Sequence, residues 1–239
     1  MKKIILTLSL LMLISLTSFG QKKRTSSIIL TQQETANLFT DSLKKQLGIN
    51  YPIRSVYKCK DKSGIFYMVL TETNDNITTS SDTLHHNIKA FNFRQNKNEL
   101  VKDWEMNDFI AKQVANKDEM EASIWFWTNY SGFADLDKDG LIDPILIYGT
   151  SGMNNTDDGR VKILTYYKGK KIAIRHQNGV LDFERNTKVD KTFYALPQAI
   201  QDHIKQIMEK MTTNNHAIFP SGWQKAMKEQ KAYFDENKK

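Results

Sequence analysis

The middle of the chain is a succession of short strand-like segments joined by turns, and this pattern limits the folds that the chain can adopt. Apolar, β-branched and aromatic residues dominate the segments, while polar turn residues separate them. The segments predicted to be strands are residues 53–60, 65–71, 86–94, 100–105, 123–133, 145–148, 161–167, 171–176 and 191–195. Short connections of this kind favour antiparallel pairing, because parallel neighbours need long crossovers.

Helical signals occur near both ends of the chain. A capping-box pattern at residues 31–34 begins a first helix, whose apolar residues recur at spacings of three and four until Gly48 ends it. Pro197 suits the first turn of a second helix, and a last helix is predicted over residues 223–234. The sequence therefore predicts an α+β fold, a largely antiparallel β-sheet with helices at the N- and C-terminal ends.

The first twenty residues are predicted to be an export signal. Lys2 and Lys3 precede an apolar stretch over residues 4–16, and Ser18 and Gly20 place small residues at the −3 and −1 positions of a cleavage site. The stretch is short for a membrane span, although an uncleaved anchor is the alternative. No cysteine stands at the cleavage point. We therefore expect an exported protein, periplasmic or secreted to the cell surface, that is not a lipoprotein and has no transmembrane segment after cleavage.

The mature chain, residues 21–239, is predicted to be one α+β domain with a flexible arm over residues 21–30 and a frayed tail over residues 235–239. Cleavage lowers the formal net charge from +7 to +5, and the basic residues are spread along the chain, which argues against nucleic-acid binding. A single cysteine, Cys59, excludes an internal disulfide and a cysteine-based zinc site. We expect Cys59 to be a buried free thiol rather than a catalytic thiolate.

The strongest motif is an acidic loop at residues 135–143. Aspartates occupy alternate positions, and Gly140 permits the sharp turn that a compact cation-binding loop needs. Calcium takes six to eight oxygen ligands, so the carboxylates and one main-chain carbonyl are predicted to bind a structural Ca²⁺ ion. The predicted ligands are Asp135, Asp137, Asp139, Leu141 and Asp143. An empty acidic turn is the alternative, but crowded carboxylates repel one another without a cation.

The spacing of this loop resembles the calcium loop of integrin-type FG-GAP repeats, in which the loop joins two strands. An EF-hand is excluded, because Leu146 occupies the position of its bidentate glutamate and a strand-like segment follows. The motif occurs once, so the resemblance extends to the loop and not to the propeller that such repeats build. We therefore predict a single calcium loop between two strands of the α+β fold.

Two catalytic functions remain as alternative interpretations of the sequence. Asp135 and Asp137 also match the Asp-x-Asp element of glycosyltransferases, but the alternation of strands and helices that this fold needs is missing. A carboxylate pair for glycoside hydrolysis would be distant in sequence and therefore invisible. Asp157, Asp158 and Arg160 form a further polar cluster, for which a solvated loop is the favoured interpretation.

Aromatic residues cluster at residues 125–130 and could line a sugar-stacking surface. Trp125 and Trp127 fall on one face of the predicted strand, with Tyr130 nearby, while Ile124 and Phe126 fall on the other. Apolar residues on both faces favour a central strand that is covered on both sides. Core packing is therefore the preferred interpretation of these rings.

The chain from Trp125 to Pro197 resembles a poorly characterised family of exported bacterial proteins grouped under surface polysaccharide biosynthesis. The likeness is carried by residues 130–137, 139–140, 143–144, 148–150, 157–160, 172–176 and 196–197. The resemblance implies a link to lipopolysaccharide or capsule, with surface glycans or envelope proteins as partners, and it implies no catalytic residues. We therefore expect a non-catalytic accessory factor of the cell envelope, and a glycan-active enzyme is the alternative.

Overall fold

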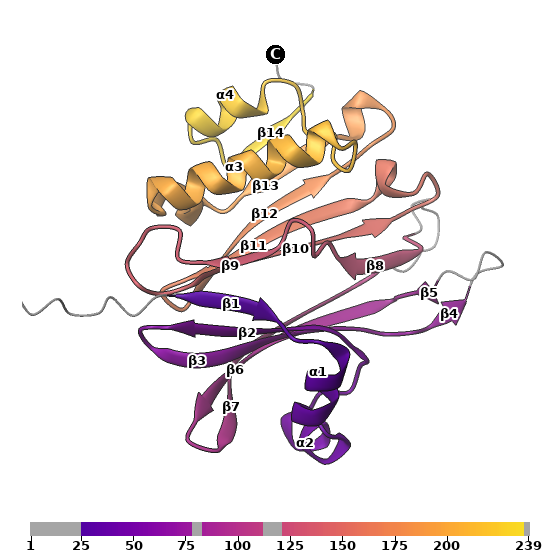
Figure 1. The fold of residues 1–239 in the computed structure, drawn as a ribbon. Coiled ribbons are helices and arrows are strands. Elements are labelled where there is room, and N and C mark those ends of the chain that lie inside the picture. The colour runs from indigo at the N-terminus through magenta and orange to yellow at the C-terminus, as the bar shows by residue number, and fades with distance from the viewer. Residues whose placement is uncertain (1–24, 78–82, 112–120, 237–239) are drawn as a thin grey trace, which may run out of the picture.

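Two antiparallel β-sheets dominate the computed structural model, which describes residues 25–77, 83–111 and 121–236 (Figure 1). The predicted signal peptide, residues 1–20, lies outside these ranges. The smaller sheet has five strands in the order β1-β2-β3-β6-β7, and a two-stranded ribbon, β4-β5, branches from the β3–β6 connection. The bounds are β1 Ser26–Ile29, β2 Ile53–Asp61, β3 Gly64–Glu72, β4 Asn76–Ile77, β5 Thr83–Leu84, β6 Asn87–Asn96 and β7 Glu99–Phe109.

The larger sheet has seven strands and carries the acidic loop. Its order is β14-β13-β12-β11-β10-β8, and β9 pairs with β10 on the same edge as β8. The bounds are β8 Ser123–Phe126, β9 Gly132–Ala134, β10 Asp143–Ser151, β11 Arg160–Tyr167, β12 Lys170–Gln177, β13 Asn186–Val189 and β14 Tyr233–Asp235. Three short 3₁₀ helices, Thr156–Asp158, Asp182–Glu184 and Lys191–Ala195, lie in its connections.

The helices lie at the two outer sides of the molecule. Near the N-terminus, α1 spans Gln32–Leu38 and α2 spans Asp41–Leu47; near the C-terminus, α3 spans Gln198–Thr213 and α4 spans Trp223–Lys228. The capping box of Thr31 and Glu34 begins α1, but the hydroxyl of Thr40 accepts a hydrogen bond from the Leu43 N–H and begins a separate helix. The predicted first helix is therefore two seven-residue helices.

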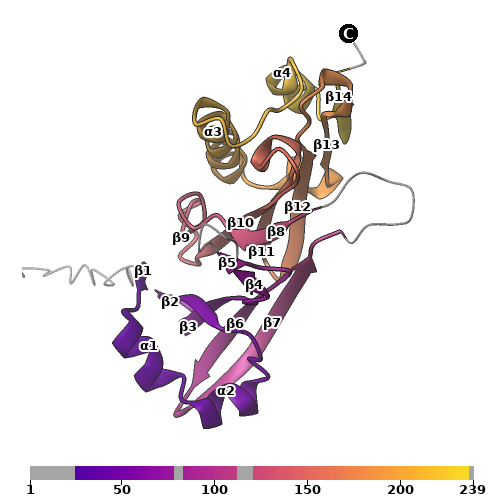
Figure 2. The same ribbon diagram turned by 90° about the vertical axis from the view of Figure 1, so that its right-hand side faces the viewer.

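The helices and sheets form four layers, and three hydrophobic clusters hold these layers together (Figures 1 and 2). One cluster fills the space between the inner faces of the two sheets and includes Met68 and Leu146. A second lies between the larger sheet and α3, where Ile200 and Ile204 are buried. The third packs α1 and α2, through residues such as Phe39, on the outer face of the smaller sheet. The order of layers is therefore helix, sheet, sheet, helix.

The predicted α+β class was wrong, because the protein is mainly β. Strands make up 44% of the described residues and helices 24%, and the strands form two antiparallel sheets accompanied by four α-helices within those residues. Hairpin patterns identify neighbouring strands, but they do not say whether successive hairpins share one sheet or stack as two. Apolar residues on both faces of the strands reflect this stacking, since each sheet is covered on one side by the other.

Three local predictions also failed, and each difference has a physical reason. The predicted strand over residues 123–133 divides into β8 and β9, because residues 128–130 form a turn between them, with the Tyr130 N–H bonded to the Trp127 carbonyl. Residues 191–195 form a 3₁₀ helix rather than a strand, with the Phe193 N–H bonded to the Asp190 carbonyl. The last helix stops at Lys228, and β14 then pairs with β13.

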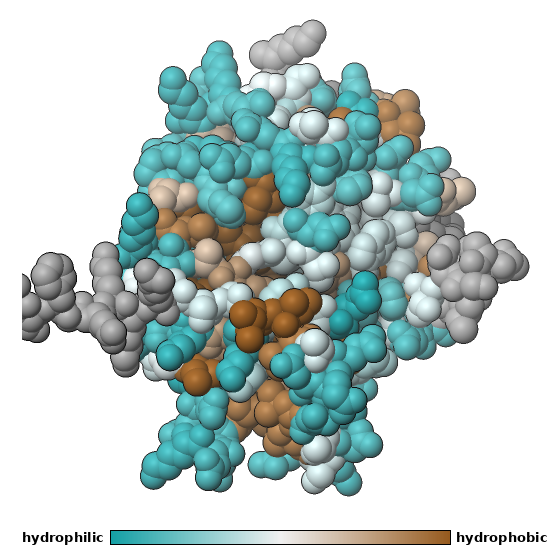
Figure 3. Space-filling view, viewed as in Figure 1, coloured by the Kyte–Doolittle hydropathy of each residue, from teal (hydrophilic) through white to brown (hydrophobic). Residues whose placement is uncertain are grey.

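The two ends of the described chain each pair with a sheet edge. Residues 26–29 of the expected N-terminal arm form β1, which pairs with β2, and β14 reaches Asp235, the first residue of the expected tail. Residues 21–24 and 237–239 lie outside the described ranges. Ile28 and Ile29 on β1 are exposed, and Figure 3 shows hydrophobic surface where this strand crosses the middle of the face. None of the helices in the described ranges has the length and apolarity that crossing a bilayer requires.

Candidate metal centre

The acidic loop is the connection between the paired strands β9 and β10. Its aspartates bend the chain by accepting hydrogen bonds from loop N–H groups: Gly140 donates to Asp135 Oδ2 at 3.0 Å, and Leu136 donates to Asp143 Oδ2 at 2.9 Å. Gly140 has a φ of +87°, a conformation that side-chain-bearing residues rarely adopt. The alternating aspartates thus build a compact turn whose carboxylates face one another.

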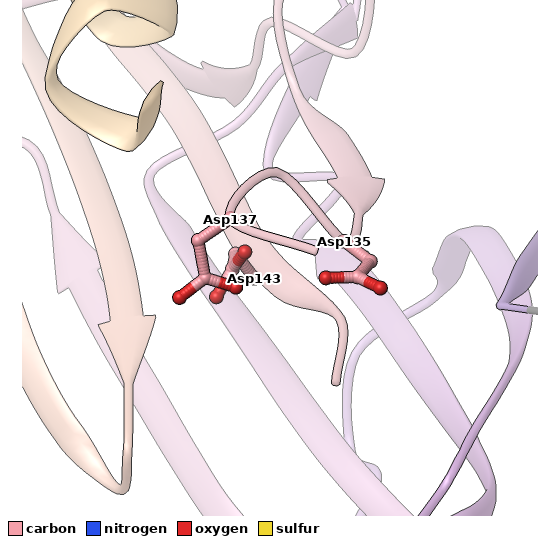
Figure 4. Close-up of side chains that lie close together, drawn as sticks. All are labelled: Asp135, Asp137 and Asp143. Atoms are coloured by element: carbon pink, nitrogen blue, oxygen red, sulfur yellow. The ribbon is translucent and has the colours of Figure 1, made fainter. Parts of the chain in front are cut away.

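Three of the predicted ligands form one group. Each of Asp135, Asp137 and Asp143 offers a carboxylate oxygen that lies within 4.8 Å of the corresponding oxygens of the other two. Figure 4 shows Asp137 and Asp143 side by side, with Asp135 across the same loop. Asp135 Oδ1 is shielded from solvent and accepts no hydrogen bond from the described residues. A group of three carboxylates with an unpartnered oxygen could hold a metal ion.

Burial and charge repulsion act together on Asp143. Burial, and then the neighbouring charges of Asp137 and Asp139, raise the pKa of the Asp143 carboxyl to about 6, although the hydrogen bond from the Leu136 N–H acts in the opposite direction. Anions held this close in a partly dehydrated loop destabilise one another. A bound cation would relieve this repulsion and favour the ionised form of all three groups.

Asp139 is placed differently from the three grouped aspartates. Its carboxylate accepts a hydrogen bond from the Leu141 N–H at 2.8 Å and lies 4.0 Å from the ammonium group of Lys62. Asp139 is not a member of the group of three. Leu141, whose main-chain carbonyl is the predicted ligand, lies in the same loop between Asp139 and Asp143.

The loop is anchored to the opposite sheet. Asp61, at the end of β2 in the five-stranded sheet, is 4% exposed, and its Oδ2 accepts a hydrogen bond from the Ile142 N–H at 3.2 Å. The Lys62 N–H donates to the Gly140 carbonyl at 3.0 Å. From its own sheet, the Tyr167 hydroxyl donates to Asp137 Oδ2 at 3.0 Å. The aspartate group therefore lies where a turn of one sheet meets a loop of the other.

Cys59 and the polar cluster at residues 157–160 were also candidates from the sequence, and their contacts serve the structure of the protein. Cys59 is a buried free thiol, as predicted, and burial raises its pKa to about 12, which disfavours the reactive thiolate. The cluster of Asp157, Asp158 and Arg160 does not form: Asp158 accepts from Asn154, whereas Arg160 pairs with Glu121.

The aromatic segment is largely buried. Ile124 and Phe126 belong to the cluster between the sheets, and Trp127 belongs to the cluster beneath α3, which confirms core packing on both faces. Trp125 is only partly buried and lines two surface pockets. The prediction of a central strand was wrong, because β8 lies at the edge of its sheet.

One polar pair, Glu72 and His85, was not predicted from the sequence. Glu72, at the end of β3, is buried, and its Oε2 lies 3.6 Å from Nε2 of His85. The two residues belong to different segments and match no spacing motif. Only the folding of the β4–β5 ribbon brings them together.

Comparison with known proteins adds nothing to these observations. No family model matches the chain, and neither a curated protein nor a solved structure matches it.

Proposed function

We propose that this is an exported protein in which the loop over residues 135–143 binds one calcium ion, and that it acts without catalysis as an accessory factor at the cell envelope. The observation that carries the proposal is the grouping of Asp135, Asp137 and Asp143 in a loop anchored to the opposite sheet. An ion held there would stabilise the contact between the sheets.

The donor set supports calcium over other metals. The grouped atoms are all carboxylate oxygens, which suit hard cations such as Ca²⁺ and Mg²⁺ rather than zinc or copper. Magnesium demands near-ideal octahedral geometry and gives up water reluctantly, whereas calcium accepts irregular sites with carbonyls and waters completing the shell. The remaining predicted ligands, Asp139 and the Leu141 carbonyl, belong to the same loop and could join the shell.

The envelope role rests on the export signal and on the family resemblance of residues 125–197. The export signal favours a place outside the cytoplasm, and the resemblance alone adds a part in surface polysaccharide assembly, with a surface glycan or another envelope protein as the partner. A glycan-cleaving enzyme would need two carboxylates flanking a sugar. In the two pockets that Trp125 lines, Glu72 is the only carboxylate among the described lining residues, so these two pockets do not offer such a pair.

Calcium is expected to raise the melting temperature of the mature chain, residues 21–239. At about 1 mM calcium and a dissociation constant of about 10 μM, binding adds about 2.7 kcal/mol to the free energy of unfolding. For a domain of this size the corresponding rise is about 5–10 °C. Thermal unfolding in EGTA, in calcium and in magnesium measures it, and magnesium should give a smaller rise.

Two variants test whether the calcium-dependent rise in melting temperature comes from the acidic loop. Asp137→Ala should remove the calcium-dependent rise, and Asp157→Ala, which removes an exposed acidic side chain outside the loop, should keep it. If Asp137→Ala melts like the parent protein in saturating calcium, the loop is not a structural calcium site.

A further inference from the structure

A groove with an aromatic and a cationic side chain at its centre lies beside β8. Two pockets of about 460 and 270 Å³ share Arg54 and Trp125 among their lining residues and therefore adjoin each other. Arg54 comes from β2 of the smaller sheet and Trp125 from β8 of the larger one, so both sheets contribute to the groove.

A buried acid–base pair lies against Arg54. Glu72 is 4% exposed, and its Oε1 accepts a hydrogen bond from the Phe126 N–H at 2.9 Å. Its other oxygen, Oε2, lies 3.6 Å from Nε2 of His85 and 3.8 Å from Nε of Arg54. Burial raises the pKa of the Glu72 carboxyl above its ordinary value, despite the opposing hydrogen bond and the neighbouring cations.

His85 makes its hydrogen bond away from Glu72. Nδ1 of His85 contacts the Thr73 carbonyl, which can only accept, so Nδ1 donates there. Nε2 faces Glu72 Oε2 at 3.6 Å, which is too long for a hydrogen bond. Glu72 Oε2 therefore lies near both His85 and Arg54 without a hydrogen bond to either.

Arg54 makes only a loose contact with Glu72 and keeps its guanidinium at the surface of the groove. Its side chain is 64% exposed, and the 3.8 Å contact with Glu72 is too long for a hydrogen bond. An exposed guanidinium with free N–H groups is suited to bind a carboxylate through two parallel hydrogen bonds. The groove thus favours an anionic ligand.

The remaining lining residues favour a sugar over an apolar acid. The indole of Trp125 is partly exposed at the junction of the pockets, and a flat aromatic ring can stack on the apolar C–H face of a pyranose. Uncharged hydrogen-bonding side chains line both ends of the groove and suit sugar hydroxyls: Asn74, Thr83, Thr128, Asn129 and Thr156. Two adjoining pockets provide room for more than one sugar unit.

We propose that this groove binds an acidic oligosaccharide, with one sugar ring stacked on Trp125 and its carboxylate paired with Arg54. The inference deepens the proposed glycan-associated role by naming the site and the class of ligand. It does not depend on the calcium loop.

The test is calorimetric titration of the mature protein with tetramers of glucuronic, galacturonic and mannuronic acid, and with their uncharged methyl esters. At least one acidic tetramer should bind, and its ester should bind about tenfold more weakly, since a lost charge-assisted pair is worth at least about 1.4 kcal/mol. Arg54→Gln and Trp125→Ala should each weaken binding by about tenfold or more, and Trp125→Phe should restore much of it.

A control variant tests whether oligosaccharide binding is specific to the groove. Arg175→Gln removes another exposed arginine, on β12 and paired with Asp190, and should bind like the parent protein. Circular dichroism and melting temperature show whether each variant is folded. The groove proposal is overturned if the parent binds none of the acidic tetramers, or if folded Arg54→Gln and Trp125→Ala bind as the parent does. Cleavage of a bound tetramer would instead contradict the non-catalytic role while leaving the groove in place.

Discussion

His176 shows how a single buried residue links stability to pH. Its ring is 3% exposed, with Nε2 2.7 Å from Asn178 Oδ1 and Nδ1 2.9 Å from Thr187 Oγ1. Burial lowers the pKa of His176 to about 4, and its hydrogen bonds only partly oppose this. In the unfolded chain the imidazole has a pKa of about 6.5 and takes up a proton more readily. The residue therefore serves the fold as a neutral ring.

This burial predicts a loss of stability in acid. As pH falls from about 6.5 to about 4, the unfolded state binds a proton that the folded state resists, so the free energy of unfolding decreases by about 3 kcal/mol from this residue. Above pH 6.5 the contribution is fully present, and below pH 4 the loss levels off. Urea denaturation of the parent and of His176→Gln at several pH values measures the difference.

The His176→Gln variant should be less stable at pH 7 but less sensitive to acid over this window. His203→Gln is the matched control, because His203 is only half buried, although burial also lowers its pKa. Equal acid sensitivity of the parent and His176→Gln would show that another group causes the loss.

At the scale of single elements, β10 depends on a glycine for close packing. A Cβ atom at Gly149 would lie 2.4 Å from Cζ2 of Trp127 and 2.9 Å from the Arg160 carbonyl oxygen. At Gly132 in the neighbouring β9, a Cβ atom would meet nothing within 4 Å. The Trp127 ring thus packs directly on the backbone of β10.

Gly149→Ala is expected to destabilise the protein by about 1–3 kcal/mol, because the indole and a strand backbone must both move. Gly132→Ala changes the same residue type in the same sheet and should stay within about 0.5 kcal/mol of the parent. Chemical denaturation of both variants measures this. A Gly149→Ala protein as stable as Gly132→Ala would contradict the close packing of Trp127 on β10.

The sequence predicted most individual hairpins and the position of the acidic loop, but it did not predict how the strands divide into sheets. Alternating apolar residues at positions such as Met68 and Leu146 indicate burial without indicating what covers them. Thr40 could have indicated a second helix start, since a threonine precedes Asp41 there. Glu72 and His85 could not be found from sequence, because only tertiary folding makes them neighbours.

At the scale of the whole molecule, polar links join the sheets at several places, and at two of them an aspartate of the smaller sheet forms the link. At the acidic loop, Asp61 bonds Ile142. Elsewhere, Asp108 of β7 accepts a hydrogen bond from the Tyr148 hydroxyl at 2.9 Å and pairs with Lys162. Burial opposes ionisation of Asp108, but the hydrogen bond and charge of Lys162 outweigh it and lower the pKa of this carboxyl. Both links supplement the hydrophobic cluster between the sheets.

If the loop joins the sheets through a bound ion, the effects of Asp61 and of the ion should be coupled. Asp61→Ala leaves the N–H groups of Ile142 and Ser63 without their carboxylate partner and should cost about 1–3 kcal/mol. In calcium, the double variant Asp61→Ala/Asp137→Ala should lose less than the sum of the two single losses, by about 0.5–3 kcal/mol.

Denaturant unfolding of the parent, the two single variants and the double variant, each in calcium and in EGTA, measures this coupling free energy. The coupling should shrink in EGTA, where no ion connects the loop to the sheet contact. Strict additivity in calcium would mean that Asp61 and the aspartate group act independently.

Each sheet is made from one continuous stretch of the chain, the smaller from residues 26–109 and the larger from residues 123–235, and strand neighbours are mostly neighbours in sequence. Most pairings within a sheet therefore need only short loop closures, which favours rapid folding, whereas β14 reaches β13 after α3 and α4. When a chain crosses a membrane starting from its N-terminus, all strands of the smaller sheet emerge before those of the larger sheet. If the chain is exported as proposed, docking of the two sheets would be the late step of maturation, on the side of the membrane where external calcium is available.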